Sequence, residues 1–334
     1  MNLNQFSGMA LPEVEKTLIE TVQQAYPADC EPLRGMLAYH MGWEGVGAGP
    51  EAQGKRIRPL LVLLTAQAAG GDWHTAVPAA AAVELIHNFS LIHDDIQDQS
   101  PLRRGRATLY TTVGVAQAIN AGDSMFSLAQ LAMLGLNSTC PPAVVVAAVR
   151  CLNETCLRLT QGQYLDISFE TRTNLTIDEY WSMIGGKTAA LLAACAGLGA
   201  LIGGTSTGTQ ELAREYGRSL GLAFQVLDDY LGIWGEASLT GKSVESDLVT
   251  RKKTLPILFG LQNDKEFARR WKESITASDV GEVAALLTRE GARDYTLETA
   301  DRLTTQAMQS LAEAFPDTCA LLQDLSTRLL KRQS

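Results

Sequence analysis

The chain has 334 residues, of which 46% are hydrophobic and 19% are charged, and its formal net charge is −9. This composition is typical of a globular protein with a sizeable core. The acidic balance and the lack of a basic tract argue against nucleic acid as a partner. A polyanion could still bind where basic residues cluster or where a divalent cation bridges the two.

Helical periodicity is widespread along the chain, and convincing strand patterns are nearly absent. The pattern predicts a first helix over Pro12–Tyr26, ended by Pro27, and a second over Pro32–Met41. The segment Gly42–Gly54 holds five glycines and a proline, which predicts a loop.

Longer helices follow, and together they predict one all-α domain spanning residues 1–334. A second loop, polar and glycine-containing, is expected over Gly235–Lys253, with shorter helices from there to Lys331. The longer helices are expected at Arg58–Ala69, Thr75–Gln97, Ala107–Leu136, Pro142–Phe169, Ile177–Ile202 and Gln210–Trp234.

The most apolar stretch, Thr188–Gly204, has 17 residues. A spanning helix needs about 20 apolar residues, so we expect a buried core helix and no transmembrane segment. The start of the chain lacks the basic and apolar regions of a signal peptide. We therefore expect a cytoplasmic protein whose cysteines are reduced and form no zinc site. There are six: Cys30, Cys140, Cys151, Cys156, Cys195 and Cys319.

The sharpest local motif is His93-Asp94-Asp95-Ile96-Gln97-Asp98, at the end of a mostly apolar helix. Asp94 and Asp98 share a helix face, and Asp95 lies about 100° around it. Carboxylates this close repel one another unless a cation intervenes, and hard oxygen ligands suit Mg²⁺. The alternative is a solvated helix end rich in acid.

Basic residues follow at once, in Pro101-Leu102-Arg103-Arg104-Gly105-Arg106. Several arginines in a glycine-containing loop can clamp a phosphate through bidentate hydrogen bonds. They could instead form surface ion pairs with the nearby aspartates.

A second acidic pair, Asp228-Asp229, lies near the end of another apolar helix. Two such clusters could face one another across a bundle core, where helical proteins often build metal sites. More cations follow glycine-rich segments, where backbone amides favour an anion. Each alone is more typical of a solvated charge: Lys55 and Arg58, Lys187 beside Thr188, and Lys242, Lys252 and Lys253.

In their order and spacing these motifs resemble the trans-type polyprenyl diphosphate synthase family, from about Gly54 to Pro256. The resemblance is carried by Gly54-Lys55-Arg56-Ile57-Arg58-Pro59, Asp94-Asp95-Ile96-Gln97-Asp98, Arg103-Arg104-Gly105, Gly186-Lys187-Thr188, Phe224-Gln225-Val226-Leu227-Asp228-Asp229, Gly241-Lys242 and Lys252-Lys253-Thr254-Leu255-Pro256.

The resemblance implies an isoprenoid-synthase helical bundle around a central active-site cavity, usually a homodimer, with three Mg²⁺ ions per site. It implies condensation of isopentenyl diphosphate with an allylic diphosphate, by ionisation, condensation and elimination. Metal would be held by Asp94, Asp95, Asp98, Asp228 and Asp229. The allylic diphosphate would be held by Arg103, Lys187, Gln225, Lys242 and Lys252. Isopentenyl diphosphate would be held by Lys55, Arg58, His87 and Arg104, with Thr188 lining the pocket.

The chain departs from the family where the second motif usually has a third aspartate, here Gly232. Glu236, one turn further on, is a candidate to help through water. Before the first acid cluster, Phe89 would form the floor of the product tunnel, and the small Ser90 would leave room beside it. This combination resembles synthases that stop at C20, geranylgeranyl diphosphate, with C15 farnesyl diphosphate as the next choice.

Three alternatives remain open at the level of sequence. A terpene cyclase on the same fold would use similar aspartates, but it would not need Lys55, Arg58 and Arg104. A non-catalytic subunit of a heteromeric synthase would usually lose acid-cluster residues. A generic helical binding protein would leave the order of the motifs unexplained.

Overall fold

The computed structural model of the chain describes residues 1–235 and 246–331. Across these ranges the chain is helical except for turns, loops and one pair of two-residue strands. The predicted all-α class is therefore confirmed. All six cysteines are free.

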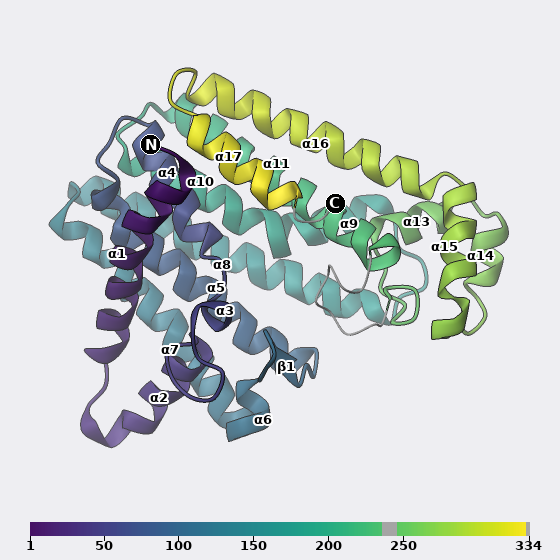
Figure 1. The fold of residues 1–334 in the computed structure, drawn as a ribbon, viewed down its shortest axis with the longest axis horizontal. Helices are drawn as coiled ribbons and strands as arrows, with labels where there is room; N and C mark the ends of the chain where they lie inside the picture. The colour runs from purple at the N-terminus through teal and green to yellow at the C-terminus, as the bar shows by residue number, and fades with distance from the viewer. Residues whose placement is uncertain (236–245, 332–334) are drawn as a thin grey trace. The chain divides into compact units, whose positions relative to one another are not determined.

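The chain forms two compact units. Figure 1 shows their helices, coloured by residue number from purple at the N-terminus to yellow at the C-terminus. The first comprises Met1–Asn153 and Cys195–Gln210, and the second comprises Glu154–Ala194 and Glu211–Ser334. The boundaries fall inside three helices, α8, α10 and α11. Each unit carries one of the two acid motifs.

The first unit begins with these elements: α1 (Leu3–Gln23), η1 (Ala28–Cys30), α2 (Glu31–His40), α3 (Pro50–Gln53), α4 (Ile57–Ala68), η2 (Trp73–Ala76), α5 (Val77–Gln97), β1 (Leu102–Arg103), β2 (Arg106–Ala107), α6 (Leu109–Val113), α7 (Val115–Leu134), η3 (Gly135–Ser138) and the start of α8 (Pro142–Glu170).

The remaining elements are α9 (Ile177–Ile184), the π-helix η4 (Gly185–Ala189), α10 (Ala190–Ile202), α11 (Thr207–Trp234), α13 (Leu255–Gln262), α14 (Glu266–Arg270), η5 (Ala277–Asp279), α15 (Val280–Arg289), α16 (Ala292–Ala314) and α17 (Ala320–Lys331).

The first helix starts nine residues before the predicted Pro12, because Asn2 and Gln5 form a capping box at Leu3. Pro12 lies inside the helix and cannot donate to the carbonyl of Gly8. Gly8 is exposed, so water can bond that carbonyl. The prediction missed this start because proline is usually a boundary signal.

Three other elements differ from the prediction. The helix expected over Ala107–Leu136 is divided at Gly114, whose φ of +80° suits glycine. The helix expected over Ile177–Ile202 contains the π-helical turn η4. The arginine loop forms an antiparallel pair in which Arg103 faces Arg106. Strands of two residues are too short to leave a periodic sequence pattern.

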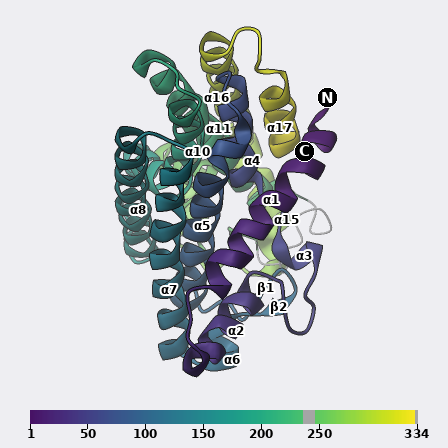
Figure 2. The same ribbon diagram turned by 90° about the vertical axis from the view of Figure 1, so that its left-hand side faces the viewer.

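Helix α5 forms the core of the first unit and lies beside α7 (Figure 2). Its small and branched side chains from Ala79 to Ile86 are fully buried, so neighbouring helices approach it closely. The helix ends at Gln97, at the first acid motif. A rigid, buried helix therefore positions the carboxylates.

Helix α11 has the corresponding role in the second unit. Its residues Leu222, Ala223 and Val226 share a buried cluster with Tyr180 of α9 and Leu255 of α13. This packing fixes the helix turn that carries Asp228 and Asp229.

Two segments, Trp73–Gln97 and Ile177–Ile202, are long and apolar enough to cross a membrane by length and composition alone. In each, 67% of the most apolar window is buried inside the protein. Buried core helices of a soluble protein pass the same test, and these two supply the packing just described.

Candidate active site

The three acids of the first motif differ in exposure although they are close in sequence. Asp94 is half-buried, Asp95 is buried and Asp98 is exposed at the helix C-cap. The spacing analysis correctly placed Asp94 and Asp98 one turn apart, since the Asp98 N–H donates to the Asp94 carbonyl at 2.8 Å.

Arg103 of β1 pairs with Asp95. Its Nε donates to Oδ1 and Oδ2 of Asp95 at 2.8 and 3.0 Å, and its Nη2 lies 2.7 Å from Oδ1. Burial raises the pKa of the Asp95 carboxyl, and the guanidinium of Arg103 opposes that effect. The ion pair considered as an alternative for this loop is therefore formed by Arg103.

Arg104 turns the opposite way, because its backbone is in the left-handed region with φ +51°. Its Nη1 donates to the carbonyl of Ala52 at 2.8 Å. A Cβ on Gly54 would lie 2.7 Å from Cζ of Arg104, so the missing side chain at Gly54 makes room for the guanidinium.

Arg58 and His87, both half-buried, lie near the exposed Arg104. The Nε of Arg58 is buried and has no hydrogen-bond partner. Burial, and then the charges of Arg58 and Arg104, hold the pKa of His87 well below its usual value, so the ring is neutral. Lys55 is exposed at the edge of the same motif. An unbonded guanidinium nitrogen beside neutral imidazole suits an anion such as diphosphate.

His40 was not singled out from the sequence. It lines a cavity with Tyr39, Asp95, Arg103 and Arg104. Burial and the arginines around it lower the pKa of His40 to about 3. Its position just before a glycine-rich loop carries no pattern that would have identified it.

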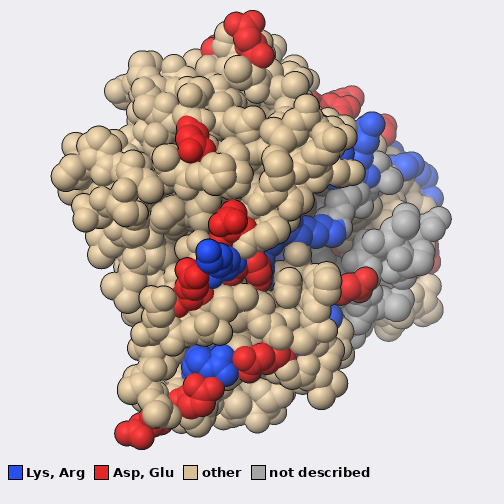
Figure 3. Space-filling model, turned by 60° about the vertical axis from the view of Figure 1, so that its left-hand side comes forward, with Lys and Arg blue, Asp and Glu red and all other residues tan. Residues whose placement is uncertain are grey.

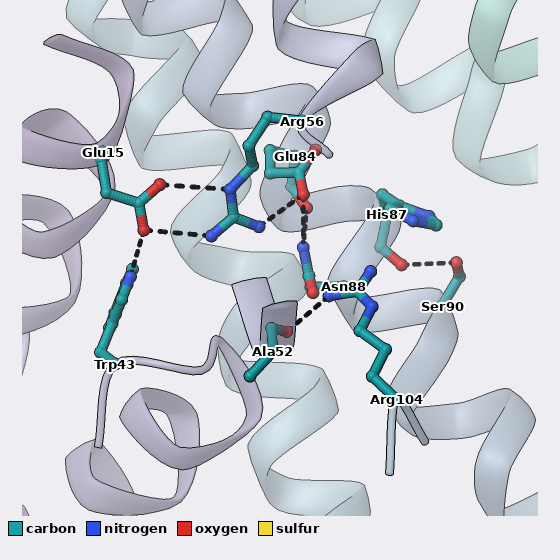
Figure 4. Close-up of polar contacts among 9 residues, drawn as sticks. All are labelled: Glu15, Trp43, Ala52, Arg56, Glu84, His87, Asn88, Ser90 and Arg104. Atoms are coloured by element: carbon teal, nitrogen blue, oxygen red, sulfur yellow. Dashed lines mark hydrogen bonds and ion pairs between the residues drawn. The ribbon is translucent and has the colours of Figure 1, made fainter. Parts of the chain in front are cut away.

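Arg56 and Glu84 were also given no role from the sequence. Figure 4 shows the Arg56 guanidinium between Glu15 of α1 and Glu84 of α5. Glu84 is 2% exposed, and an acid at this depth in an apolar helix is a signal that could have been noticed.

In the second unit, Asp229 is buried and accepts three hydrogen bonds. These come from the Tyr180 hydroxyl at 2.7 Å, the Gln225 amide at 3.0 Å and the Leu255 backbone N–H at 3.1 Å. Thr188 donates to the other end of Gln225 at 2.8 Å. Burial raises the pKa of Asp229 to about 6, although Lys252 and these donors oppose it. Asp228, beside it, is half-buried.

Lys187 is presented by the π-helical turn η4 and forms an ion pair with Asp166 of α8. Such turns are rare and often occur at functional sites. Gly162 and Gly186 let the backbones of α8 and η4 come into contact, because neither glycine has a side chain. A Cβ on Gly162 would lie 2.1 Å from the backbone nitrogen of Lys187. Asp166 was not identified from the sequence.

Lys252 is held among carboxylates. Burial disfavours its charge, but Asp229, Asp247, Asp166 and Asp228 outweigh burial and raise its pKa. The predicted residues Lys242 and Glu236 lie outside the described residues.

The missing third aspartate has a structural counterpart. A Cβ on Gly232 would lie 2.0 Å from Oδ2 of Asp247. The Asp247 N–H also donates to the Gly232 carbonyl at 3.1 Å. The carboxylate of Asp247 therefore occupies the space that a side chain at position 232 would need.

Phe89, the predicted tunnel floor, projects from α5 toward α7. Its ring centroid lies 5.3 Å from that of Phe126 and 5.0 Å from that of His93. The hydroxyl of Ser90 is turned back to the His87 carbonyl at 2.8 Å.

The oxygen donors suit Mg²⁺ as a shared ion. Among the described residues, no three His, Cys, Asp or Glu side chains come close enough to hold a metal by themselves. Mg²⁺ commonly binds through one or two carboxylates, several waters and substrate phosphates. Paired aspartates beside lysines and arginines fit that arrangement.

The sequence matches the model of the polyprenyl synthetase family over residues 48–289. The chain belongs to the polyprenyl synthetase family. The match contains every motif on which the sequence-based resemblance rested.

Individual polyprenyl synthetases are similar along almost the whole chain. A (2E,6E)-farnesyl diphosphate synthase of Mycobacterium tuberculosis (strain ATCC 25618 / H37Rv) is 43% identical, over 98% of this chain and 92% of its own length. A geranylgeranyl diphosphate synthase of the same strain is 38% identical, over 97% of each chain.

Among solved structures, a polyprenyl synthase from Caulobacter crescentus CB15 complexed with calcium and isoprenyl diphosphate is 29% identical, with a TM-score of 0.83. The match covers 99% of this chain and 97% of that one. The predicted family and helical fold are therefore confirmed. The chain is a prenyltransferase, an enzyme of the trans-prenyl diphosphate synthase type.

Proposed function

We propose that this polyprenyl synthetase condenses isopentenyl diphosphate with an allylic diphosphate in a Mg²⁺-dependent reaction that yields C20 geranylgeranyl diphosphate. The observation that carries this proposal is the group of Arg58, Arg104 and His87 beside the first acid motif. A second anion site separate from the paired lysines is what a condensing enzyme needs and a cyclase does not.

In the first unit, Lys55, Arg58, His87 and Arg104 bind isopentenyl diphosphate. The two guanidinium groups supply charge-assisted donors, which bond a phosphate more strongly than neutral donors do. Neutral His87 donates one ring N–H and adds no charge. Because these groups are held by backbone turns, they lose little freedom on binding.

The allylic diphosphate is bound by Arg103, Lys187, Gln225, Lys242 and Lys252, as the family resemblance implies, and Thr188 lines the pocket of isopentenyl diphosphate. Asp94, Asp95, Asp98, Asp228 and Asp229 hold the Mg²⁺ ions, three per site by analogy with the family. When bound, Mg²⁺ supplies Lewis acidity to the leaving diphosphate. Arg103 and Lys187 contribute to catalysis by stabilising the negative charge that develops as the allylic C–O bond breaks.

The apolar side chains around the motifs exclude water from the allylic carbocation. The double bond of isopentenyl diphosphate attacks that carbon, and a proton is lost from the adduct to the departing diphosphate. No side-chain base is required, and His93, which meets the Phe89 ring edge-to-face, has a packing role.

The C20 product length rests on Phe89 and Ser90. The Phe89 ring is supported from behind by Phe126, so it forms a firm stop for the growing chain. Farnesyl diphosphate, C15, is the next choice, and both product types occur among the similar enzymes.

We further propose a cytoplasmic homodimer whose chains each form one synthase domain. Helix α7 exposes Val115, Ile119, Leu131 and Leu134, by 41 to 60%. At 100° per residue these four fall within an arc of about 160°. Figure 3 shows that uncharged side chains cover most of one side of the molecule. An apolar strip of this kind suits a second copy of the chain, and light scattering should give twice the chain mass.

The decisive test is incubation of purified protein and Mg²⁺ with isopentenyl diphosphate and, separately, C5, C10 and C15 allylic diphosphates. Mass spectrometry follows intact diphosphates and extractable hydrocarbons. Accumulation of a C20 diphosphate supports the whole proposal, and another length keeps the condensation but rejects the floor. A hydrocarbon formed from an allylic diphosphate alone would mean a cyclase.

A further inference from the structure

Arg56 lies between Lys55 and Arg58, yet its guanidinium faces inward. Its backbone is in the left-handed region, with φ 49° and ψ 37°, at the N-cap of α4. A non-glycine residue held there costs about 1–3 kcal/mol and persists only when its surroundings over-determine it. The hydrogen bonds of the Arg56 side chain hold the backbone in this conformation.

The Arg56 guanidinium is 4% exposed and bonds two carboxylates from different helices. Its Nε and Nη2 both lie 3.1 Å from the two oxygens of Glu15 on α1. Its Nη1 lies 2.7 Å from Oε1 of Glu84 on α5. Trp43 donates to Glu15 from outside, and Asn88 donates to Glu84 at 3.1 Å (Figure 4).

The carboxylate of Glu84 acts through its charge on the arginines of the proposed isopentenyl diphosphate site. Its charge raises the pKa of both Arg58 and Arg104, against the lowering caused by their burial. One oxygen of Glu84 accepts from both Arg56 and Asn88, which fixes the carboxylate toward α4. A carboxylate released from those bonds would pair with Arg58 or Arg104.

We propose that Arg56 is a positioning residue: by binding Glu84 against Glu15, it keeps that carboxylate from neutralising the arginines that hold isopentenyl diphosphate. This inference rests on the proposed function, since it assigns Arg58 and Arg104 to that substrate. Arg56 itself does not touch the substrate. The role uses the planar fork of arginine, which bonds Glu15 through two nitrogens and Glu84 through the third; lysine has no such fork.

The test measures KM for isopentenyl diphosphate, KM for the allylic substrate and kcat in Arg56→Met, Glu84→Gln and the double variant. Arg56→Met should raise KM for isopentenyl diphosphate about tenfold, the equivalent of one charge-assisted hydrogen bond. The other two constants should stay within about twofold, because Glu84 acts on one substrate site.

The double variant Arg56→Met/Glu84→Gln separates positioning from simple structural support. With the released negative charge removed, KM for isopentenyl diphosphate should return to within about threefold of the parent value. Replacement of a whole buried ion pair is also tolerated better than removal of one partner. Arg34→Met is the matched control, because Arg34 pairs with Glu31 and Glu44 on the surface of α2 and should change no kinetic constant.

An unchanged KM in Arg56→Met, or a double variant no better than Arg56→Met, overturns the inference while wild-type turnover leaves the proposed function intact. Absence of isopentenyl diphosphate consumption by the wild-type protein overturns the proposed function instead. If Arg56→Met does not fold by circular dichroism, Arg56→Lys with and without Glu84→Gln gives the same comparison, with the same ordering of KM values required.

Discussion

The two units handle their cationic groups in different ways. In the first unit, the half-buried Arg58 and the exposed Arg104 lie near neutral imidazoles, and the charge of Glu84 acts on both arginines. In the second unit, Lys187 is paired with Asp166, and Lys252 lies among four carboxylates. The proposed function therefore assigns direct anion binding to the first unit, and to the second unit lysines that are released for a diphosphate once divalent cations occupy its acids.

The largest expected effect comes from loss of the divalent cations, which the acid motifs of both units are proposed to hold. Asp94→Ala or Asp228→Ala should lower kcat at least about 100-fold, since a divalent ion supplies several kcal/mol to the leaving group. Removal of metal with EDTA should abolish turnover but leave isopentenyl diphosphate binding measurable by calorimetry. Asp301→Ala, on the exposed side of α16, is the control; loss of isopentenyl diphosphate binding in EDTA would contradict the comparison.

Replacement of one basic side chain in each unit tests the two proposed diphosphate sites separately. Arg58→Met should raise KM for isopentenyl diphosphate about tenfold or more and leave the allylic KM nearly unchanged. Lys187→Met should do the reverse. Steady-state kinetics with one substrate saturating gives both constants. Equal effects of both substitutions on both substrates would show that the two halves do not bind separate diphosphates.

Restoring the family's third aspartate should harm this protein. In Gly232→Asp the new Cβ would lie 2.0 Å from Asp247 Oδ2, and two carboxylates would compete for one space. We expect kcat to fall several-fold, about 1 kcal/mol in barrier. Gly8→Asp, where a Cβ meets nothing within 4 Å, is the matched control. A gain in activity would mean that Asp247 does not fill the role of the missing acid.

The burial of His40 near the arginines of the first unit also predicts how stability depends on pH. His40 has its pKa lowered to about 3 when folded, against 6.5 when unfolded, so the unfolded chain binds more protons between these values. Stability should fall as pH drops below 6.5, by about 1.4 kcal/mol per pH unit for this one group. The free energy of unfolding of His40→Gln, measured with urea at several pH values, should depend less steeply on pH than that of the wild-type protein. The surface variant His74→Gln should keep the wild-type dependence.

The smallest effect on rate, but a visible one on product, is expected from Phe89→Ala. Removing the ring opens space between α5 and α7, and products longer than C20 should appear in the mass spectrum. Phe126→Ala should give a weaker shift in the same direction, because it removes only the support behind the floor. An unchanged product distribution in Phe89→Ala would exclude Phe89 as the stop.

Much of the helical fold could be predicted because long apolar periodicity is a strong signal, and α2, α4 and α8 begin and end within one residue of their predicted bounds. The start of α1 could not, because its cap at Asn2 outweighs the signal from Pro12. The break at Gly114 depends on the positive φ of one glycine, and the turn η4 depends on the close approach of Gly162 to Gly186 and Lys187; neither leaves a periodic trace.

The site divides in the same way. Asp94 and Arg104 could be found because they stand in charged clusters, and Lys187 because Gly186-Lys187-Thr188 resembles a motif of the family. Asp166 and Asp247 were missed because they are single acids in ordinary surroundings, and only the fold brings them to Lys187 and Lys252. Opposite orientations of Arg103 and Arg104 follow from one left-handed residue, which no sequence pattern marked.

The empty space at Gly54 links two positions that are far apart in sequence. Any side chain there would displace the Arg104 guanidinium, so a change at 54 amounts to a change at 104. Across homologues the two positions should therefore vary together: where glycine is lost, selection to retain the arginine should relax as well. In a library randomised at both codons and selected for activity, active clones should retain Gly54 and Arg104 together.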